Sequence, residues 1–151
     1  MCLNQARYGI AWGAVGAAMA CYSEALDYSR SRIQFGAPIA SYQLVQQKLV
    51  GMLSDITASQ LRCYRLGLLK EEGKVRPQQI SLAKRDNVSM ALEAARATRD
   101  ILGANGITEE YQCGRHLRNL ESVKTYEGTH DIHTLVLGED VTGIPAYSNN
   151  S

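Results

Sequence analysis

One short segment of the chain combines residue types that suit acid–base chemistry. Residues 126–133 read Y-E-G-T-H-D-I-H, so a carboxylate stands before a glycine and an expected helix N-cap, Thr129. A glutamate on a loop beside a helix start can point into a cleft, where apolar walls would raise its proton affinity toward that of a general base. Gly128 would let a substrate carbonyl reach a backbone N–H. Glu127 is therefore our candidate for a catalytic base.

The same segment also offers possible metal ligands. Glu127, His130, Asp131 and His133 all carry atoms that bind metal ions. Histidines three residues apart at the start of an amphipathic helix are more often one partly buried face, and His116 has no ligand spacing to them. We therefore expect no metal site here.

Two glycine-containing turns could bring charge or backbone to a ligand. Residues 32–39 read R-I-Q-F-G-A-P-I after an expected helix, and an arginine at a helix C-terminus can grip a phosphate with its planar fork. Residues 102–107 read L-G-A-N-G-I, where the glycines permit close approach of a ligand. Taken alone, each segment is more readily explained as a helix end and a turn. The second is not a dinucleotide-binding fingerprint, because no strand precedes it and the G-x-G-x-x-G spacing is missing.

Hydrophobic periodicity predicts long helices that would position these segments. In a first helix, which ends before Gly36 and Pro38, large side chains step by four and three residues along one stripe: Tyr8, Trp12, Val15, Met19, Tyr22 and Leu26. A second helix is expected from an N-cap near Ser41 to Gly73, with an apolar stripe of Val45, Leu49, Met52, Ile56, Cys63 and Leu66.

Three further helices follow. Pro77 suits the first turn of a third helix, which would end at Gly103 and bury Ile80, Ala83, Val88, Ala91, Leu92, Ala95 and Leu102. A fourth is expected over Tyr111–Leu120, and a last one starts near Thr129 and would bury Ile132, Leu135, Val136 and Val141. No segment alternates clearly with period two, so we predict an all-α fold, an antiparallel four-helix bundle, in one domain over residues 1–151.

The bulk composition argues against several classes of protein. The 151 residues carry a formal net charge of +1 with interspersed charges, so neither a nucleic acid nor an anionic membrane is expected as a partner. The uncharged stretch from Tyr8 to Ser23 is too short for a membrane span and contains glycines, which favours a buried helix. The four cysteines form no C-x-x-C pair and are interpreted as reduced thiols in a reducing compartment. We expect no targeting peptide in this sequence.

Three motifs in this order resemble the C-terminal domain of acyl-CoA dehydrogenases. They are R-x-x-F-G at 32–36, L-G-x-N-G at 102–106 and Y-E-G-T at 126–129. The resemblance covers essentially the whole chain, and the flanking residues 3–10 and 125–133 look most similar to glutaryl-CoA dehydrogenases. The chain departs from the pattern at one turn, because many relatives have Gln and Gly where this sequence has Asp100 and Ala104.

The resemblance also implies roles for individual residues. Glu127 would be the catalytic base, and Gly128 would offer its N–H to the thioester carbonyl of the substrate. The acyl-CoA site would be lined by Leu3, Asn4, Arg7 and Gly128. FAD would be contacted, partly from a neighbouring subunit, by Arg32, Gln43, Asp100, Ile101, Leu102, Gly103, Ala104, Thr129, Asp131 and Tyr147.

The reaction that the resemblance implies is removal of an α-proton with hydride transfer from the β-carbon to FAD. For glutaryl-CoA, loss of CO₂ would follow and give crotonyl-CoA, with an electron-transfer flavoprotein as electron acceptor. The N-terminal helical and middle β domains of the family are missing here, so the chain would be an inactive fragment of a dimer of dimers. Its location would be the mitochondrial matrix in a eukaryote or the cytoplasm in a bacterium.

Three other functions stay open on the sequence alone. The enzyme could be a dehydrogenase of another acyl-CoA or a non-decarboxylating glutaryl-CoA dehydrogenase. A non-enzymatic helical interaction module is the alternative from a different class, because a helical bundle does not fix a function.

Overall fold

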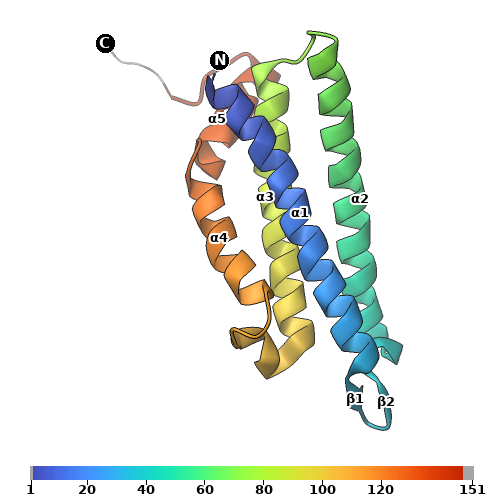
Figure 1. Cartoon of the computed structure of the whole chain (residues 1–151). Coiled ribbons are helices and arrows are strands. Elements are labelled where there is room, and N and C mark those ends of the chain that lie inside the picture. Colours follow the sequence, from blue (N-terminus) through green and yellow to red (C-terminus); the bar gives the residue numbers. More distant parts are fainter. Residues whose placement is uncertain (1, 148–151) are drawn as a thin grey trace.

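The chain forms an up-and-down arrangement of long helices. The computed structural model describes residues 2–147. In chain order the elements are α1 (Cys2–Ser31), β1 (Ile33–Gln34), β2 (Ala37–Pro38), η1 (Ile39–Ser41), α2 (Gln43–Glu71), α3 (Pro77–Leu102), η2 (Gly103–Ile107), α4 (Cys113–Thr125) and α5 (His130–Thr142). Figure 1 shows α1, α2, α3 and α4 running alternately down and up, which confirms the predicted all-α antiparallel bundle.

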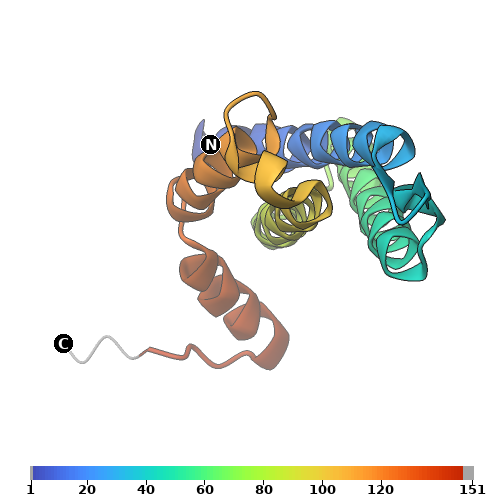
Figure 2. The same ribbon diagram turned by 90° about the horizontal axis from the view of Figure 1, so that it is seen from below.

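Helix α3 lies at the centre of the bundle. It packs against α1, α2, α4 and α5, and in the end-on view of Figure 2 the other helices surround it. All the residues predicted to form its buried stripe are buried. Pro77 stands in its first turn and Gly103, with φ 61°, forms its C-cap, as predicted. The proline at the start, the glycine at the end and the apolar periodicity between them all indicate the same helix, which is why the sequence predicted α3 correctly.

The predicted stripe of α1 was wrong in part. Val15 is buried, but Trp12 and Met19 are 42% and 46% exposed. The buried face is instead made of small residues at helical spacing: Ala11, Ala14, Ala18, Cys21 and Ala25. Small side chains let the α1 backbone approach α3 closely, and the larger side chains then lie on the flanks of the contact.

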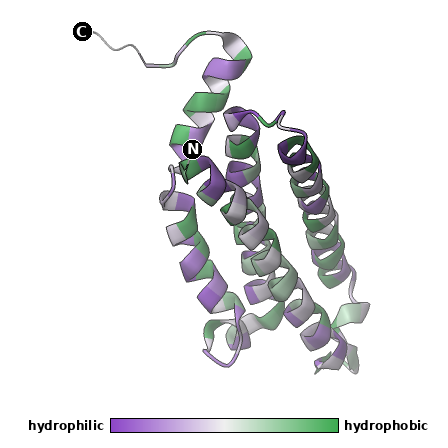
Figure 3. Cartoon of the chain, turned by 45° about the horizontal axis from the view of Figure 1, so that its top comes forward, coloured by the Kyte–Doolittle hydropathy of each residue, from purple (hydrophilic) through white to green (hydrophobic). Residues whose placement is uncertain are grey.

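The predicted start of α2 and the predicted burial of the last helix also need correction. Tyr42, not Ser41, precedes α2, because the Ser41 hydroxyl donates to the Pro38 carbonyl instead of capping the helix. In α5, Ile132 and Val141 are 49% and 82% exposed, although both were predicted to be buried. Helix α5 packs mainly on α3 and projects beyond the other helices in Figure 3, so one neighbour can cover only one of its faces.

The remaining boundaries hold with small shifts. The apolar stripe predicted for α2 is buried except for Val45, which is partly exposed. Helix α4 continues to Thr125, five residues beyond its predicted end at Leu120.

All four cysteines are free thiols, and burial raises the pKa of Cys21 to about 12. Within residues 2–147, no helix is long and apolar enough to cross a membrane.

A buried asparagine joins three helices. The side-chain amide nitrogen of Asn87 on α3 donates to the Ala11 carbonyl on α1 (3.1 Å) and to the Cys63 sulfur on α2 (3.0 Å). Its carbonyl oxygen accepts from the Arg62 guanidinium at 2.6 Å. One fully buried side chain therefore fixes the relative position of α1, α2 and α3.

We predict that Asn87→Ala destabilises the chain by about 1–3 kcal/mol, because buried hydrogen-bonding groups on two helices lose their partner. Urea unfolding of the 151-residue chain measures the loss. The matched control is Gln47→Ala on the exposed face of α2, which should change stability by less than about 0.5 kcal/mol. Equal effects of the two substitutions would contradict a special role for Asn87.

A second prediction concerns His133, the one buried residue of α5. Burial, followed by the charges of Lys84 and Arg7, lowers the pKa of His133 from 6.5 to about 4. Between these two pH values the unfolded chain binds a proton that the folded chain does not, so stability falls as the pH drops from 6.5 to 4. The pKa shift corresponds to about 3 kcal/mol.

Urea unfolding at a series of pH values tests this. The His133→Gln variant has no imidazole to protonate, so its stability should fall less steeply than that of the wild type over the same interval. Parallel curves for the two proteins would show that His133 does not contribute to acid sensitivity.

Candidate active site

A four-residue loop joins α4 to α5 and carries the predicted base. Tyr126 follows the last residue of α4, and the Thr129 hydroxyl accepts a hydrogen bond from the Ile132 N–H at 3.2 Å, which confirms Thr129 as the N-cap of α5. Between them, Glu127 has φ 56° and Gly128 has φ 92°. Left-handed backbone at a non-glycine residue costs about 1–2 kcal/mol, so the surroundings must hold Glu127 in place.

Glycine is the only residue type that fits at position 128 of this loop. A Cβ added there would lie 2.9 Å from the His133 Nε2 atom and 3.1 Å from the Arg7 Nη2 atom. Its positive φ adds to the steric argument. The His133 ring and the Arg7 guanidinium are therefore packed directly against the Gly128 backbone.

Two cations from other helices bind the loop backbone. Arg7, near the start of α1, donates from Nε to the Glu127 carbonyl at 2.8 Å. Lys84, on α3, donates from Nζ to the Tyr126 carbonyl at 3.0 Å and to the Gly128 carbonyl at 2.7 Å. Three consecutive carbonyl groups thus each accept a charge-assisted hydrogen bond, which is stronger than a neutral one.

The Glu127 carboxylate is left free to react. Its Oε2 atom is buried and has no hydrogen-bond partner among residues 2–147. An unpaired, desolvated carboxylate oxygen is what proton abstraction needs, because no protein donor competes for its lone pairs. Asp131, the alternative carboxylate of the segment, is exposed on α5.

The two histidines of the segment lie in different surroundings. Both ring nitrogens of His133 are buried without a partner in the described part of the chain, whereas Nδ1 of His130 lies 3.4 Å from the Ser89 hydroxyl. Burial, followed by the Arg85 and Lys124 charges, lowers the pKa of His130. Over residues 2–147, no three His, Cys, Asp or Glu side chains are grouped to hold a metal ion.

The predicted substrate residues lie at the same end of the bundle. Arg7 touches the loop directly, while Leu3 and Asn4 stand one turn earlier on α1. Leu3 is 56% exposed, and Asn4 lines a cleft of about 330 Å³ with Lys70 and Pro77. The structure therefore brings Arg7 and Gly128 together and places Leu3 and Asn4 one helical turn from Arg7.

An apolar groove of about 550 Å³ begins beside this loop. It runs between α1 and α4 from Tyr126 along Gly9, Gly13 and Gly16. These three glycines have no atom within 4 Å of where a Cβ would be, so the groove is open along its length.

Part of the predicted FAD set lies at the opposite end of the bundle. Arg32 follows the last residue of α1 and lines a groove of about 370 Å³ with Ile101, Leu102, Gly103 and Ala104. The structure thus brings together five of the predicted residues from two turns that are distant in sequence.

The other five predicted FAD contacts do not line that groove. Asp100 forms ion pairs with Lys48 and Arg99 outside it, and the Lys48 hydrogen bond lowers the pKa of the Asp100 carboxyl. Gln43 begins α2 and is exposed. The remaining contacts, Thr129, Asp131 and Tyr147, belong to the Glu127 end and are also exposed.

The two ends are far apart. With a rise of about 1.5 Å per residue, Arg7 and Arg32 are separated by roughly 37 Å along α1. One bound cofactor molecule in a single copy of the chain cannot contact both ends.

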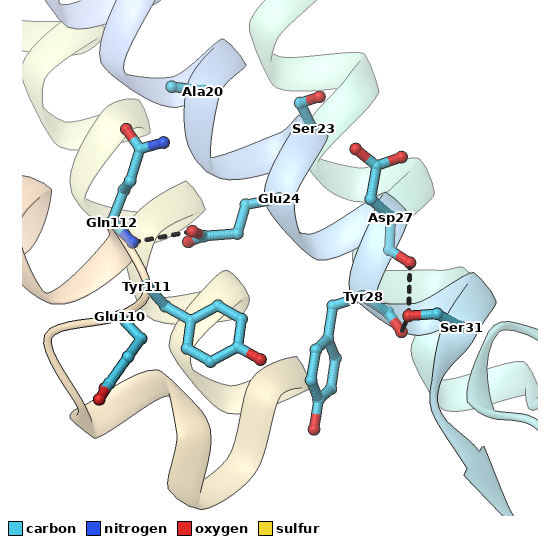
Figure 4. A pocket seen from close by; sticks show the side chains of 9 residues that line it. All are labelled: Ala20, Ser23, Glu24, Asp27, Tyr28, Ser31, Glu110, Tyr111 and Gln112. Atoms are coloured by element: carbon cyan, nitrogen blue, oxygen red, sulfur yellow. Dashed lines mark hydrogen bonds between the residues drawn. The ribbon is translucent and has the colours of Figure 1, made fainter.

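A larger groove, of about 810 Å³, lies between α1 and the loop before α4 (Figure 4). Its central carboxylate, Glu24, accepts hydrogen bonds from the backbone N–H groups of Gln112 (2.8 Å) and Cys113 (3.1 Å). Glu24 therefore caps the start of α4 from another helix, and its role is structural.

Sequence reasoning missed Lys84, and it assigned His133 to a partly buried helix face without a role at the loop. A signal was present, because Lys84 and Asn87 occupy positions that share the buried stripe of α3 with Ile80, Ala83 and Val88. A polar residue in an apolar stripe marks a buried polar interaction, but only the fold shows which partner it meets.

Known proteins match both the sequence and the fold. Residues 1–142 match the family model of the acyl-CoA dehydrogenase C-terminal domain. The short-chain-specific acyl-CoA dehydrogenase of Megasphaera elsdenii is 34% identical over 138 residues, which are 91% of this chain and 36% of that protein.

Solved structures agree. Two structures of glutaryl-CoA dehydrogenase from Mycobacterium smegmatis, one of them in complex with FADH2, are 50% and 46% identical, each with a TM-score of 0.95 over 97% of this chain and 38% of theirs. A chain in the structure of the electron transferring flavoprotein of Acidaminococcus fermentans is 31% identical, with a TM-score of 0.89 over 93% of this chain and 37% of that one.

The chain therefore spans between 36% and 38% of the length of these relatives. The extent of the family-model match, together with the strained glutamate loop that follows α4, leads to one conclusion. This chain belongs to the acyl-CoA dehydrogenase family, of which it is a C-terminal domain.

Proposed function

We propose that this chain is the C-terminal catalytic part of an FAD-dependent acyl-CoA dehydrogenase, with Glu127 as the base that removes the α-proton of the substrate. The observation that carries the proposal is the buried, unpartnered Oε2 atom of Glu127 on a loop that two cations hold in a strained conformation. Strain of this kind persists where the surroundings over-determine it, and it clusters at active sites.

The residues of this chain would act on the substrate in two ways. Glu127 would accept the α-proton at its free carboxylate oxygen, while the Gly128 N–H, which has no acceptor among residues 2–147, would donate to the thioester carbonyl. A hydrogen bond at that carbonyl stabilises the enolate charge that develops as the proton leaves. Arg7 would keep both groups aligned through the peptide between them.

The residues at the Arg32 end fit a nucleotide cofactor. An exposed guanidinium stands beside an open groove, and the positive φ of Gly103 leaves backbone accessible there. Arg32 and the backbone of residues 101–104 would hold FAD at this end, and Thr129, Asp131 and Tyr147 would do so at the other. FAD, when bound, supplies the acceptor for the hydride from the β-carbon.

The separation of the two ends supports a shared site. Because roughly 37 Å separates Arg7 from Arg32 by the helical rise, each FAD would be contacted by the Glu127 end of one copy and the Arg32 end of another. Large exposed side chains on α2, such as Leu44, Val50 and Leu61, offer surface for such association. We therefore propose a homo-oligomer, a dimer of dimers, as the active form.

We further propose glutaryl-CoA as the substrate, with oxidative decarboxylation to crotonyl-CoA and an electron-transfer flavoprotein as electron acceptor. The support is the similarity to the Mycobacterium smegmatis glutaryl-CoA dehydrogenase, at 50% identity, against 34% for the short-chain-specific relative. The N-terminal helical and middle β domains would supply the rest of the flavin and substrate sites. The enzyme would work in the mitochondrial matrix or in the bacterial cytoplasm.

We predict that Glu127→Gln abolishes dehydrogenation while FAD and acyl-CoA still bind. Gln keeps the shape of Glu but cannot accept the proton, and a positioned base contributes about 10²–10⁴-fold to the rate. The measurement is anaerobic flavin bleaching with glutaryl-CoA in the full-length enzyme, or in a chimera in which this chain replaces the matching part of the Mycobacterium smegmatis enzyme.

Glu109→Gln is the matched control, because Glu109 is exposed in the loop before α4 and should not affect the rate. Bleaching of the Glu127→Gln enzyme at the wild-type rate would remove Glu127 from the mechanism and make Asp131 the next candidate.

We also predict that the chain by itself does not retain FAD. The two groups of proposed contacts lie at opposite ends of α1, so one copy offers only peripheral contacts to any one cofactor molecule. Equilibrium dialysis of the purified chain against FAD measures this, with the full-length enzyme as the positive control. A chain that purifies with stoichiometric flavin would contradict it.

A further inference from the structure

The ammonium group beneath the catalytic loop is unusual in its burial. Among residues 2–147, Lys84 is the one charged side chain of Asp, Glu, Lys or Arg type that is fully buried, at 1% exposure. Burial, followed by the Arg7 charge, lowers the pKa of Lys84 to about 8. Its hydrogen bonds go to the Tyr126 and Gly128 carbonyls and not to a carboxylate. A buried cation without an ion-pair partner destabilises a fold, so stability does not explain why a lysine occupies this position.

Lys84 and Arg7 together determine where the loop N–H groups point. They hold the carbonyls of residues 126, 127 and 128, and no peptide bond in the described chain is cis. In a planar trans peptide the N–H points away from the C=O of the same unit. The N–H groups of Glu127 and Gly128 therefore point away from the two cations, and neither has an acceptor among residues 2–147.

We propose that Lys84 is a positioning residue for the reaction: by holding the carbonyls on both sides of Glu127, it fixes the carboxylate and the free N–H groups of the loop toward the substrate. The proposal rests on the proposed role of Glu127 as the base. An ammonium suits the task because its three donors can bridge two carbonyls two residues apart. Arg7 alone holds only the middle carbonyl.

Loss of Lys84 would release the loop without touching its reactive groups. The Tyr126 and Gly128 carbonyls would lose their donor, and the left-handed Glu127 would no longer be held on either side. A displacement of about 1 Å at a reacting group can lower a rate 10²-fold. Substrate affinity should change little, because Lys84 is buried behind the loop.

The first experiment measures loop order in the full-length enzyme by hydrogen–deuterium exchange. The Lys84→Met variant should raise the exchange rate of two protected amides by about tenfold, that of Tyr126 in the loop and that of His133 in the first turn of α5, while amides of α2 keep the wild-type rate. Lys74→Met is the matched control, since Lys74 is an exposed lysine in the turn between α2 and α3. An equal increase in exchange throughout the enzyme, or no increase at the loop, overturns the proposal.

The second experiment measures the rate of flavin reduction by acyl-CoA. Lys84→Met should lower this rate about 10²-fold with an unchanged FAD content and a KM within about twofold of the wild type. Lys84→Arg, which keeps a cation with several donors, should recover part of the rate. If Lys84→Met does not fold, Lys84→Gln keeps donors but no charge and should give an intermediate loss.

A double variant separates this proposal from the proposed function. If Lys84 acts mainly by positioning Glu127, adding Lys84→Met to Glu127→Gln lowers the residual rate by much less than 10²-fold, because the base that the loop positions is already lost and only the loop N–H groups remain to be aligned. An additional 10²-fold loss in the double variant overturns the positioning role. Wild-type bleaching by Glu127→Gln alone refutes the assignment of the base, and the exchange measurement then still decides whether Lys84 orders the loop.

Discussion

The close packing of α1 on α3 is the constraint on which the site depends. Alanines at positions 11, 14 and 18 line the contact, and Asn87 bonds the Ala11 carbonyl across it. Because α1 can lie so near α3, Arg7 and Lys84 reach the same loop from two helices. Larger residues in that contact would push α1 outward and move the Arg7 guanidinium away from the Glu127 carbonyl.

The loop itself collects features that disfavour stability. It contains a glutamate in the left-handed region and a buried carboxylate oxygen with no partner in residues 2–147, and it covers a buried lysine. The neutral His133 ring, packed against Gly128, adds a fourth. Elsewhere in residues 2–147 such features are isolated: Phe35, in the exposed turn between β1 and β2, has φ 53°, and His116 has one buried ring nitrogen without a partner. Other buried polar groups, such as Asn87 and Thr98, are hydrogen-bonded. The concentration of strain and unpaired polar groups at one loop is what a reactive site requires, because groups already satisfied by the protein cannot act on a substrate.

The distance between the two ends of the bundle bears on how the protein would assemble. The glutamate loop and the Arg32 groove are built by the two ends of the same helix, α1, so their separation is fixed by its length. A cofactor site that uses both ends has to be completed by another copy. The projecting α5 and the apolar side chains of α2 leave surface that this one chain does not cover. Shared sites of this kind make oligomer formation and activity inseparable.

The sequence alone determined which helices form and which residue types could do chemistry. Periodicity, Pro77 and Gly103 predicted α3 correctly, and Thr129 was recognised as an N-cap, because these signals depend on neighbours within one turn. The motif around Glu127 identified the candidate base for the same reason. The predictions of which face of α1 and which residues of α5 are buried were wrong in part. Large apolar side chains such as Trp12 and Ile132 can lie at the surface, and in α1 small residues make the closer contact. Only the tertiary structure decided that Lys84, 42 residues before Tyr126, contacts the Glu127 loop and that Arg32 lies at the far end of the bundle. Such contacts depend on how helices that are distant in sequence pack against one another, which no local pattern records.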